Sequence, residues 1–179
     1  MTLVVASDLH GSAFWVQRLL EICEAEKASQ LLLLGDLLYH GPRNPLPEGY
    51  DPQTVAEMLN GWRNKITAIR GNCDAEVDSM VLQFPLVESA LLFLDGYRFF
   101  CTHGHHYNPD CLPPLAKGDL FLFGHTHLPL IEYENGIWFL NPGSVALPKN
   151  GDTKTYMVYH DHEVVLKSFD GSELIRQRL

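Results

Sequence analysis

The chain has 179 residues, which corresponds to about one domain, and 46% of these residues are hydrophobic while 20% are charged. This composition excludes a disordered or collagen-like chain. The formal net charge of −9 disfavours a basic surface of the kind that binds long nucleic acids, although bound metal ions could supply local positive charge. We therefore expect a single domain over residues 1–179 and no long nucleic acid as its partner.

The N-terminal part of the chain predicts alternating strands and helices. Ser12 and the pair Asp51-Pro52 are typical helix starts, and short apolar runs indicate the strands. The expected elements are a strand at 3–6, a helix at 12–27, a strand at 31–34, a helix at 51–64 and a strand at 66–69. A strand, a helix and a strand at this spacing indicate a βαβ unit with parallel strands. The loop at 39–51 is rich in proline and glycine, and loops of this length are often functional.

The remainder of the chain predicts mostly strands. The pairs Asp95-Gly96 and Asn135-Gly136 separate apolar runs in the way that is typical of β-hairpin turns. The expected strands lie at 91–94, 97–102, 120–123, 131–134, 137–140, 156–159 and 164–169. We expect these strands to pair antiparallel, and we expect the chain to form one α/β domain with two packed sheets.

The cysteines and the apolar runs indicate the cellular compartment. No two cysteines have the spacing of a C-x-x-C pair or of a zinc site, so we expect reduced thiols in a cytoplasmic protein. Asp8 and His10 interrupt the first apolar run, which argues against a signal peptide. No run approaches the roughly 20 apolar residues that span a bilayer, and we expect no membrane partner.

Five predicted strands are each followed by residues of the kind that bind metals. These segments are Asp8-Leu9-His10, Asp36, Asn72-Cys73-Asp74, His103-Gly104-His105 and His125-Thr126-His127. A glycine lies beside the ligands in every segment, as a crowded site requires, because glycine permits close approach of the backbone. Ligands of open α/β sheets bind beyond the carboxyl ends of the strands, so the five segments are expected to converge on one pocket.

The types of ligand narrow the choice of ion. Carboxylate, imidazole and amide groups without an obligatory thiolate suit Mn²⁺, Fe²⁺ or Zn²⁺ better than Ca²⁺. Seven candidates are too many for one tetrahedral site, so we expect two ions that share one carboxylate. The seven candidate ligands are Asp8, His10, Asp36, Asn72, His103, His125 and His127.

The order of these motifs resembles that of the calcineurin-like metallophosphoesterase superfamily. The motifs D-x-H, G-D, G-N-x-D, T-H-G-H and G-H-T-H occur in sequence, and Asn141-Pro142-Gly143-Ser144 matches a further loop of the family. The short chain, the loop at 41–44 and the G-N-C-D form of the third motif look most like the small bacterial YfcE-type phosphodiesterases. The resemblance implies an αββα sandwich, in which two β-sheets are flanked by helices.

The resemblance also implies how the ions are held and used. One ion would be bound by Asp8, His10, Asp36 and His127, and the other by Asp36, Asn72, His103 and His125. Two divalent ions are implied, with Mn²⁺ preferred and Fe, Zn or Ni left open. The expected catalytic residues are Asp36, Asn72, Asp74 and His103. The expected reaction is hydrolysis of a small phosphodiester by a hydroxide that bridges the metals. If Cys73 is only a small apolar side chain turned inward, Asp74 or a water would serve the leaving group.

Cys73 departs from the resemblance, because many phosphoprotein phosphatases of the superfamily have a histidine there. A thiol is a poor general acid, so we expect diesters, or esters with good leaving groups, rather than alkyl monoesters with poor leaving groups as substrates. Arg43, Cys73 and His105 are candidate substrate contacts. The alternatives are a phosphomonoesterase of the same fold, a nuclease, or a binding scaffold like a retromer subunit that shares the fold. A homo-oligomer is left open.

Overall fold

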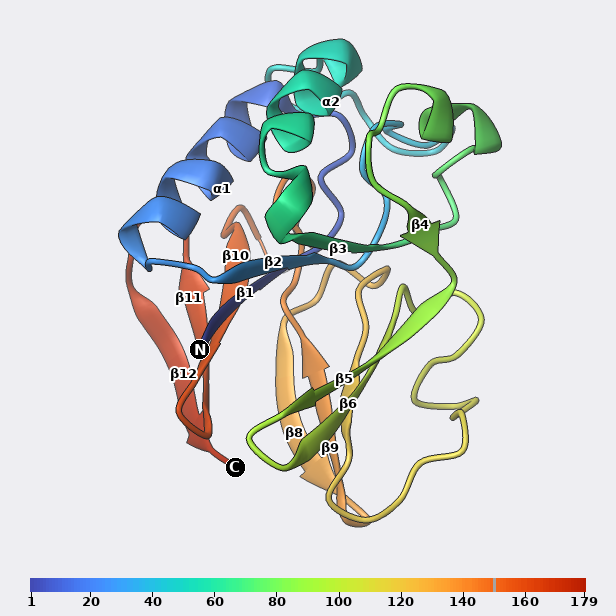
Figure 1. Cartoon of the computed structure of the whole chain (residues 1–179). Coiled ribbons are helices and arrows are strands. Elements are labelled where there is room, and N and C mark those ends of the chain that lie inside the picture. Colours follow the sequence, from blue (N-terminus) through green and yellow to red (C-terminus); the bar gives the residue numbers. More distant parts are fainter. Residues whose placement is uncertain (150) are drawn as a thin grey trace.

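The computed structural model describes residues 1–149 and 151–179, which form two β-sheets packed face to face (Figure 1). The first sheet contains β1 (Thr2–Ala6), β2 (Gln30–Leu33), β3 (Ile66–Ile69), β4 (Leu86–Val87), β10 (Thr155–His160), β11 (Glu163–Ser168) and β12 (Glu173–Arg178). Its strand order is β12-β11-β10-β1-β2-β3-β4. The second sheet contains β5 (Ser89–Leu94), β6 (Tyr97–Thr102), β7 (Leu120–Leu122), β8 (Leu130–Glu134) and β9 (Ile137–Asn141), in the order β5-β6-β7-β9-β8.

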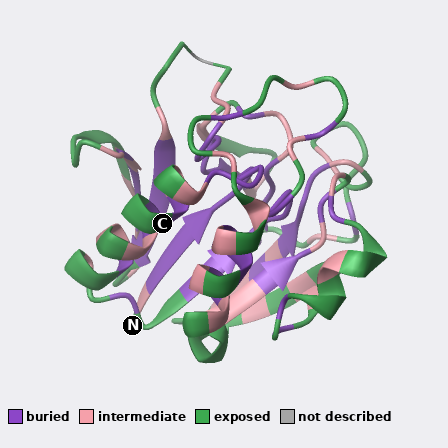
Figure 2. Ribbon diagram, turned by 90° about the horizontal axis from the view of Figure 1, so that it is seen from above, coloured by how far each residue is buried: buried purple, intermediate pink, exposed green. Residues whose placement is uncertain are grey.

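The helices lie over the outer face of the seven-stranded sheet (Figures 1 and 2). They are α1 (Ala13–Ala25), α2 (Pro52–Gly61) and the 3₁₀ helices η1 (Arg63–Lys65) and η2 (Glu76–Met80). Both α-helices start at the predicted caps, since Ser12 Oγ accepts from Trp15 N at 3.3 Å and Asp51 Oδ1 accepts from Thr54 N at 3.1 Å. Within the described residues, no helix is long and apolar enough to cross a membrane.

The core lies in two layers on either side of the seven-stranded sheet. Strand residues alternate between the layers, because successive side chains of a strand point to opposite faces. Val4 contributes to the layer beneath the helices, whereas Val5 contributes to the layer between the sheets. Figure 2 shows the strands buried and the outer sides of the helices exposed. The outer face of the five-stranded sheet is covered by the helix-free segment 103–119, in which Leu115 packs against a cluster containing Phe121 and Phe123.

The two-sheet sandwich confirms the predicted fold class, but the expected antiparallel pairing is wrong for part of the second sheet. β6 pairs with β7 in parallel, and β7 pairs with β9 in parallel. The reason is that the long segment 103–119 and the β8 hairpin each return the chain to its starting edge before the next strand begins. The parallel strands β1, β2 and β3 and the parallel strands β6, β7 and β9 therefore place their carboxyl ends together.

Candidate metal centre

The five predicted segments converge where the carboxyl ends of the two sets of parallel strands meet. Backbone hydrogen bonds join the two sheets there, for example from Val145 N to Ser7 O at 3.0 Å and from Ala146 N to Asp8 O at 3.3 Å. The backbone N–H of His125 also donates to Asp8 Oδ2 at 3.1 Å, which links the first and the last of the segments. The convergence expected from the sequence is thus present in the fold.

The backbone of these segments is strained. Ten non-glycine residues in the described part of the chain have a positive φ, a conformation that costs free energy for residues with a Cβ. Five of these ten are candidate metal ligands: Asp8 (φ 59°), His10 (46°), Asp36 (55°), His125 (64°) and His127 (59°). The unfavourable backbone conformation is concentrated at the candidate ligands. This indicates that the fold accepts a local cost in free energy because that conformation orients these side chains toward one site.

Asp8, His10 and His127 form the first ligand group. Asp8 Oδ1 lies 3.2 Å from His127 Nε2 and 3.7 Å from His10 Nε2, and the two Nε2 atoms are 3.2 Å apart. Asp8 Oδ1 is buried and accepts no hydrogen bond in the structure. Burial alone would raise the pKa of Asp8, but the histidines around it hold this pKa well below its usual range, so the carboxylate is charged.

Backbone carbonyls orient three of the candidate histidines. The bonds run from Nδ1 of His10 to Tyr39 O (3.0 Å), from Nδ1 of His103 to Leu34 O (2.7 Å) and from Nδ1 of His127 to Leu147 O. A carbonyl only accepts hydrogen bonds, so Nδ1 of each ring carries a proton and Nε2 faces the site, where a ring in its neutral form offers a lone pair. The Nε2 atoms and the buried carboxylate of Asp8 are directed toward the same place, so together they could bind a cation. Imidazole and carboxylate donors suit a divalent metal.

Asp36, His103 and Asn72 form the second ligand group. His103 Nε2 lies 3.0 Å from Asn72 Oδ1 and 3.5 Å from Asp36 Oδ1. Asp36 Oδ2 lies 3.8 Å from His10 Nε2 of the first group. The ring centroid of His125 is 5.1 Å from that of His103, so His125 lies beside this group. Asp36 thus lies between His10 of the first group and His103 of the second, which is the position that a carboxylate shared by two ions requires.

Asp74 is nearly buried, but its carboxylate faces the protein backbone. Its Oδ2 accepts from Asp36 N at 2.8 Å and from Gly71 N at 2.7 Å, and its Oδ1 accepts from Leu37 N at 2.7 Å. Burial raises the pKa of Asp74 to about 6, although these hydrogen bonds oppose the shift. The three bonds join the ends of β2 and β3, so this geometry favours a positioning role for Asp74. Its expected catalytic role stays a prediction.

A cleft of about 510 Å³ opens beside the two ligand groups. Its lining residues are Asp36, Tyr39, Gly41, Pro42, Arg43, Asn44, Asn72, Cys73, Asp74, Ala75, His125, His127 and Lys149. Lys149 was not anticipated from the sequence, because no motif marks it. The fold brings it there through a hydrogen bond from Lys149 N to His127 O at 3.2 Å. Arg43 and Lys149 therefore supply two cations to the cleft of an acidic protein.

His105 lies apart from this cleft and lines a neighbouring cavity that it shares with His125. Burial and the nearby histidines lower the pKa of His105 to about 4, so its ring is neutral at pH 7. Its Nδ1 is buried without a hydrogen-bond partner in the structure. The structure thus places His105 near the site, and its role as a substrate contact stays a prediction.

Comparison with known proteins agrees with this geometry. The family model of the calcineurin-like phosphoesterase superfamily domain matches residues 1–163. The chain is 44% identical to phosphodiesterase YfcE of Escherichia coli K12 over 178 residues, which covers 99% of this chain and 97% of the relative.

Solved structures also show similarity to this family of phosphoesterases. The structure of the E. coli phosphoesterase Yfce matches with a TM-score of 0.97 and 43% identity, covering 99% of both chains. A single mutant of Vps29 from Entamoeba histolytica is 21% identical with a TM-score of 0.66, covering 100% of this chain and 99% of that chain, and this likeness shows the fold alone. The predicted resemblance and the predicted class of enzyme are confirmed. The strand-end ligands, the two-sheet fold and these matches together show that the chain belongs to the calcineurin-like phosphoesterase superfamily.

Proposed function

We propose that this protein is a phosphodiesterase that uses two divalent metal ions, with Mn²⁺ preferred, to hydrolyse small phosphodiesters. The observation that carries the proposal is the contact of Asp36 with both ligand groups. The similarity to a phosphodiesterase over nearly the whole chain supports the reaction class. Bound divalent ions would neutralise charge on the phosphate and activate water for attack.

Different residues would bind the metal ions and the phosphate of the substrate. One ion would be bound by Asp8, His10, Asp36 and His127. The other ion would be bound by Asp36, Asn72, His103 and His125. Arg43 and Lys149 would hold the anionic phosphate in the cleft. In the reaction, the oxygen of water forms a bond to phosphorus, the ester bond to the leaving group breaks, and the leaving oxygen gains a proton. The products are one phosphomonoester and one alcohol.

The environment of Cys73 supports diesters as the substrates. Burial raises the pKa of its thiol to about 12, and the nearby carboxylate of Asp36 adds to the shift. Proton transfer from this thiol would leave a thiolate beside Asp36, which is unfavourable. Alkyl monoesters depend strongly on a proton donor for the leaving group, so they are expected to be poor substrates.

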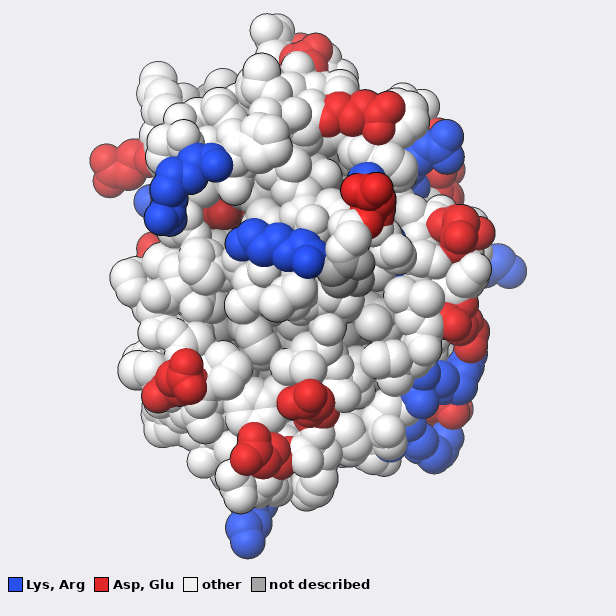
Figure 3. Space-filling view, turned by 180° about the vertical axis from the view of Figure 1, so that it is seen from behind, with Lys and Arg blue, Asp and Glu red and all other residues white. Residues whose placement is uncertain are grey.

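The charges on one face of the molecule agree with a small substrate. The face of the molecule in Figure 3 carries scattered acidic and basic side chains, and its described residues form no continuous basic band. Long nucleic acids require such a band. The spacing of the cysteines in the sequence is the basis for proposing a reducing, cytoplasmic compartment. The core shared between the two sheets supports one domain over residues 1–179.

The direct test is hydrolysis by metal-stripped protein that is refilled with Mn²⁺. We expect cleavage of bis(p-nitrophenyl) phosphate to exceed that of p-nitrophenyl phosphate by at least about 10-fold in kcat/KM. Release of p-nitrophenolate measures both reactions, and stripped protein without metal is the control. Equal or faster cleavage of the monoester would overturn the substrate class, and metal binding without turnover of either ester would favour the scaffold alternative.

Replacing Cys73 with histidine is expected to raise cleavage of β-glycerophosphate, a monoester with a poor leaving group, by about 10-fold or more. An imidazole has a pKa near neutrality and can protonate the leaving alkoxide. Phosphate release measures the rate, and Cys111→His, a change at an exposed cysteine outside the cleft, is the matched control. If Cys73→His gains no monoesterase activity over this control, Cys73 does not set the preference for diesters.

A further inference from the structure

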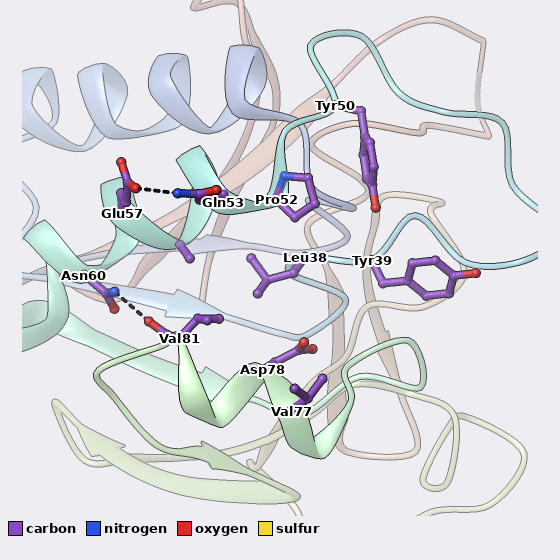
Figure 4. Close-up of a pocket in the computed structure, with 11 residues that line it drawn as sticks. Leu38, Tyr39, Tyr50, Pro52, Gln53, Glu57, Asn60, Val77, Asp78 and Val81 are labelled. Carbon is purple, nitrogen blue, oxygen red and sulfur yellow. Dashed lines mark hydrogen bonds between the residues drawn. The ribbon is translucent and has the colours of Figure 1, made fainter.

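A second cavity adjoins the metal cleft, between α2, η2 and the loop that follows β2 (Figure 4). Its volume is about 610 Å³, which is within the range of sites for small organic ligands. The residues that line it are Leu38, Tyr39, Tyr50, Pro52, Gln53, Ala56, Glu57, Asn60, Val77, Asp78 and Val81. None of these residues belongs to the metal centre.

The two cavities share walls. Tyr39 lines both, and its carbonyl accepts from the metal-centre residue His10 at 3.0 Å. Leu38 follows Asp36 by only two residues in the chain, and η2 begins directly after Ala75, which lines the cleft. The second cavity therefore borders the metal cleft at Tyr39.

The second cavity is preformed. The side chain of Asn60 on α2 donates to Val81 O at 2.8 Å and accepts from Gln83 N at 2.7 Å. These bonds fasten the segment after η2 to the helix, as Figure 4 shows for the bond to Val81. Leu38 and Ala56 are almost fully buried and give the cavity an apolar wall. Little ordering is needed before a ligand enters, which favours binding.

The lining selects for a particular chemistry. Most of it is aliphatic or aromatic, while the charged residues among the eleven that line it are Glu57 and Asp78, both acidic. Val77 and Val81 remain 60% and 50% exposed, so apolar surface is available to a ligand. An apolar group would gain free energy here, whereas a group with negative charge would be repelled by the two carboxylates.

We propose that this cavity binds one of the two organic substituents of the phosphodiester, and that the preferred substituent is apolar and carries no negative charge. This inference rests on the proposed phosphodiesterase function. It explains why a diester fits the site, because one substituent leaves with the alcohol product while the other is held in the cavity as the reaction proceeds.

The first test compares three diesters with the same leaving group, namely methyl, benzyl and 4-carboxybenzyl p-nitrophenyl phosphate. We expect benzyl to exceed methyl by about 10-fold or more in kcat/KM, because the aromatic ring is removed from water in the cavity. The 4-carboxybenzyl ester should lose this advantage, and Glu57→Gln should restore part of it. If no ester is hydrolysed, the phosphodiesterase proposal fails. If all three are hydrolysed equally, only the present inference fails.

The second test narrows the cavity. Val81→Trp places a large ring at its rim, and Met80→Trp makes the same change at the adjacent residue, which is 82% exposed and does not line the cavity. We expect the benzyl-to-methyl ratio to fall towards one in Val81→Trp and to persist in Met80→Trp. A ratio that persists in both variants would overturn the assignment of the substituent to this cavity.

Two measurements separate binding from turnover and from assembly. In saturation-transfer NMR, benzyl alcohol should contact metal-free wild-type protein and should lose that contact in Val81→Trp. Sedimentation should give the same mass for wild type and both variants. If Val81→Trp instead dissociates an oligomer and leaves the benzyl-to-methyl ratio unchanged, this face is an interface between copies of the chain, and the inference is wrong.

Discussion

Replacing Asp36 with asparagine is expected to remove at least one metal ion per chain and to lower kcat/KM for bis(p-nitrophenyl) phosphate by at least about 100-fold. Asp36 contacts both ligand groups, at 3.8 Å from His10 Nε2 and 3.5 Å from His103 Nε2. Asparagine keeps the size of the side chain and an oxygen that can accept from Cys73 N, but it removes the negative charge that two cations share. Metal analysis after dialysis and the diester assay measure the two effects.

A thermal measurement supplies an independent readout of the same change. A metal at about 100 times its Kd stabilises a protein by about 2.7 kcal/mol, so Mn²⁺ should raise the Tm of the wild type clearly. Asp36→Asn should lose most of this rise. Asp161→Asn is the matched control, because Asp161 also has a positive φ (49°, against 55° for Asp36). It lies in the turn after β10, next to the start of β1 and not to the end that carries Asp8. Normal metal content and rate in Asp36→Asn would contradict the two-metal proposal.

The candidate ligands were predictable because their signal is local. Each one follows a short apolar run, and the carboxyl end of such a strand is where open α/β sheets place their ligands. The helix starts were predictable for a similar reason, since Ser12 and Asp51 satisfy backbone N–H groups within the next few residues. In both cases the residues that determine the structure are neighbours in the chain.

Features that depend on distant contacts were not predictable in this way. β12 was missed because most of its residues are exposed, so it shows no alternation of apolar and polar side chains. β4 has two residues, which is too short for any pattern. The parallel pairing of β6 with β7 depends on the path of the segment 103–119. Lys149 reaches the cleft only because the chain after β9 is bonded to His127.

Replacing Gly71 with alanine is expected to weaken the metal centre although it replaces no candidate ligand. A Cβ at this position would overlap Asp36 Oδ1 and the Asp36 backbone N and would lie only 2.9 Å from Asp36 Cγ. Because Asp36 is held by hydrogen bonds to Cys73 and Asp74, it has no free space to move into. We expect the free energy of unfolding to fall by about 1–3 kcal/mol and metal affinity to fall by about 10-fold or more.

Gly61→Ala provides the matched control for this substitution. Gly61 is the last residue of α2, and a Cβ there would meet no atom within 4 Å. Alanine is the better helix former by about 0.5–1 kcal/mol, so this variant should keep or gain stability and retain its metal. Chemical denaturation gives the stabilities, and titration with Mn²⁺ at a temperature where both variants are folded gives the affinities. If folded Gly71→Ala binds Mn²⁺ as tightly as Gly61→Ala, then the position of Asp36 does not limit metal binding. If the affinity for Mn²⁺ falls in Gly71→Ala and not in Gly61→Ala, then close packing of the end of β3 against Asp36 holds the shared carboxylate between the two ligand groups.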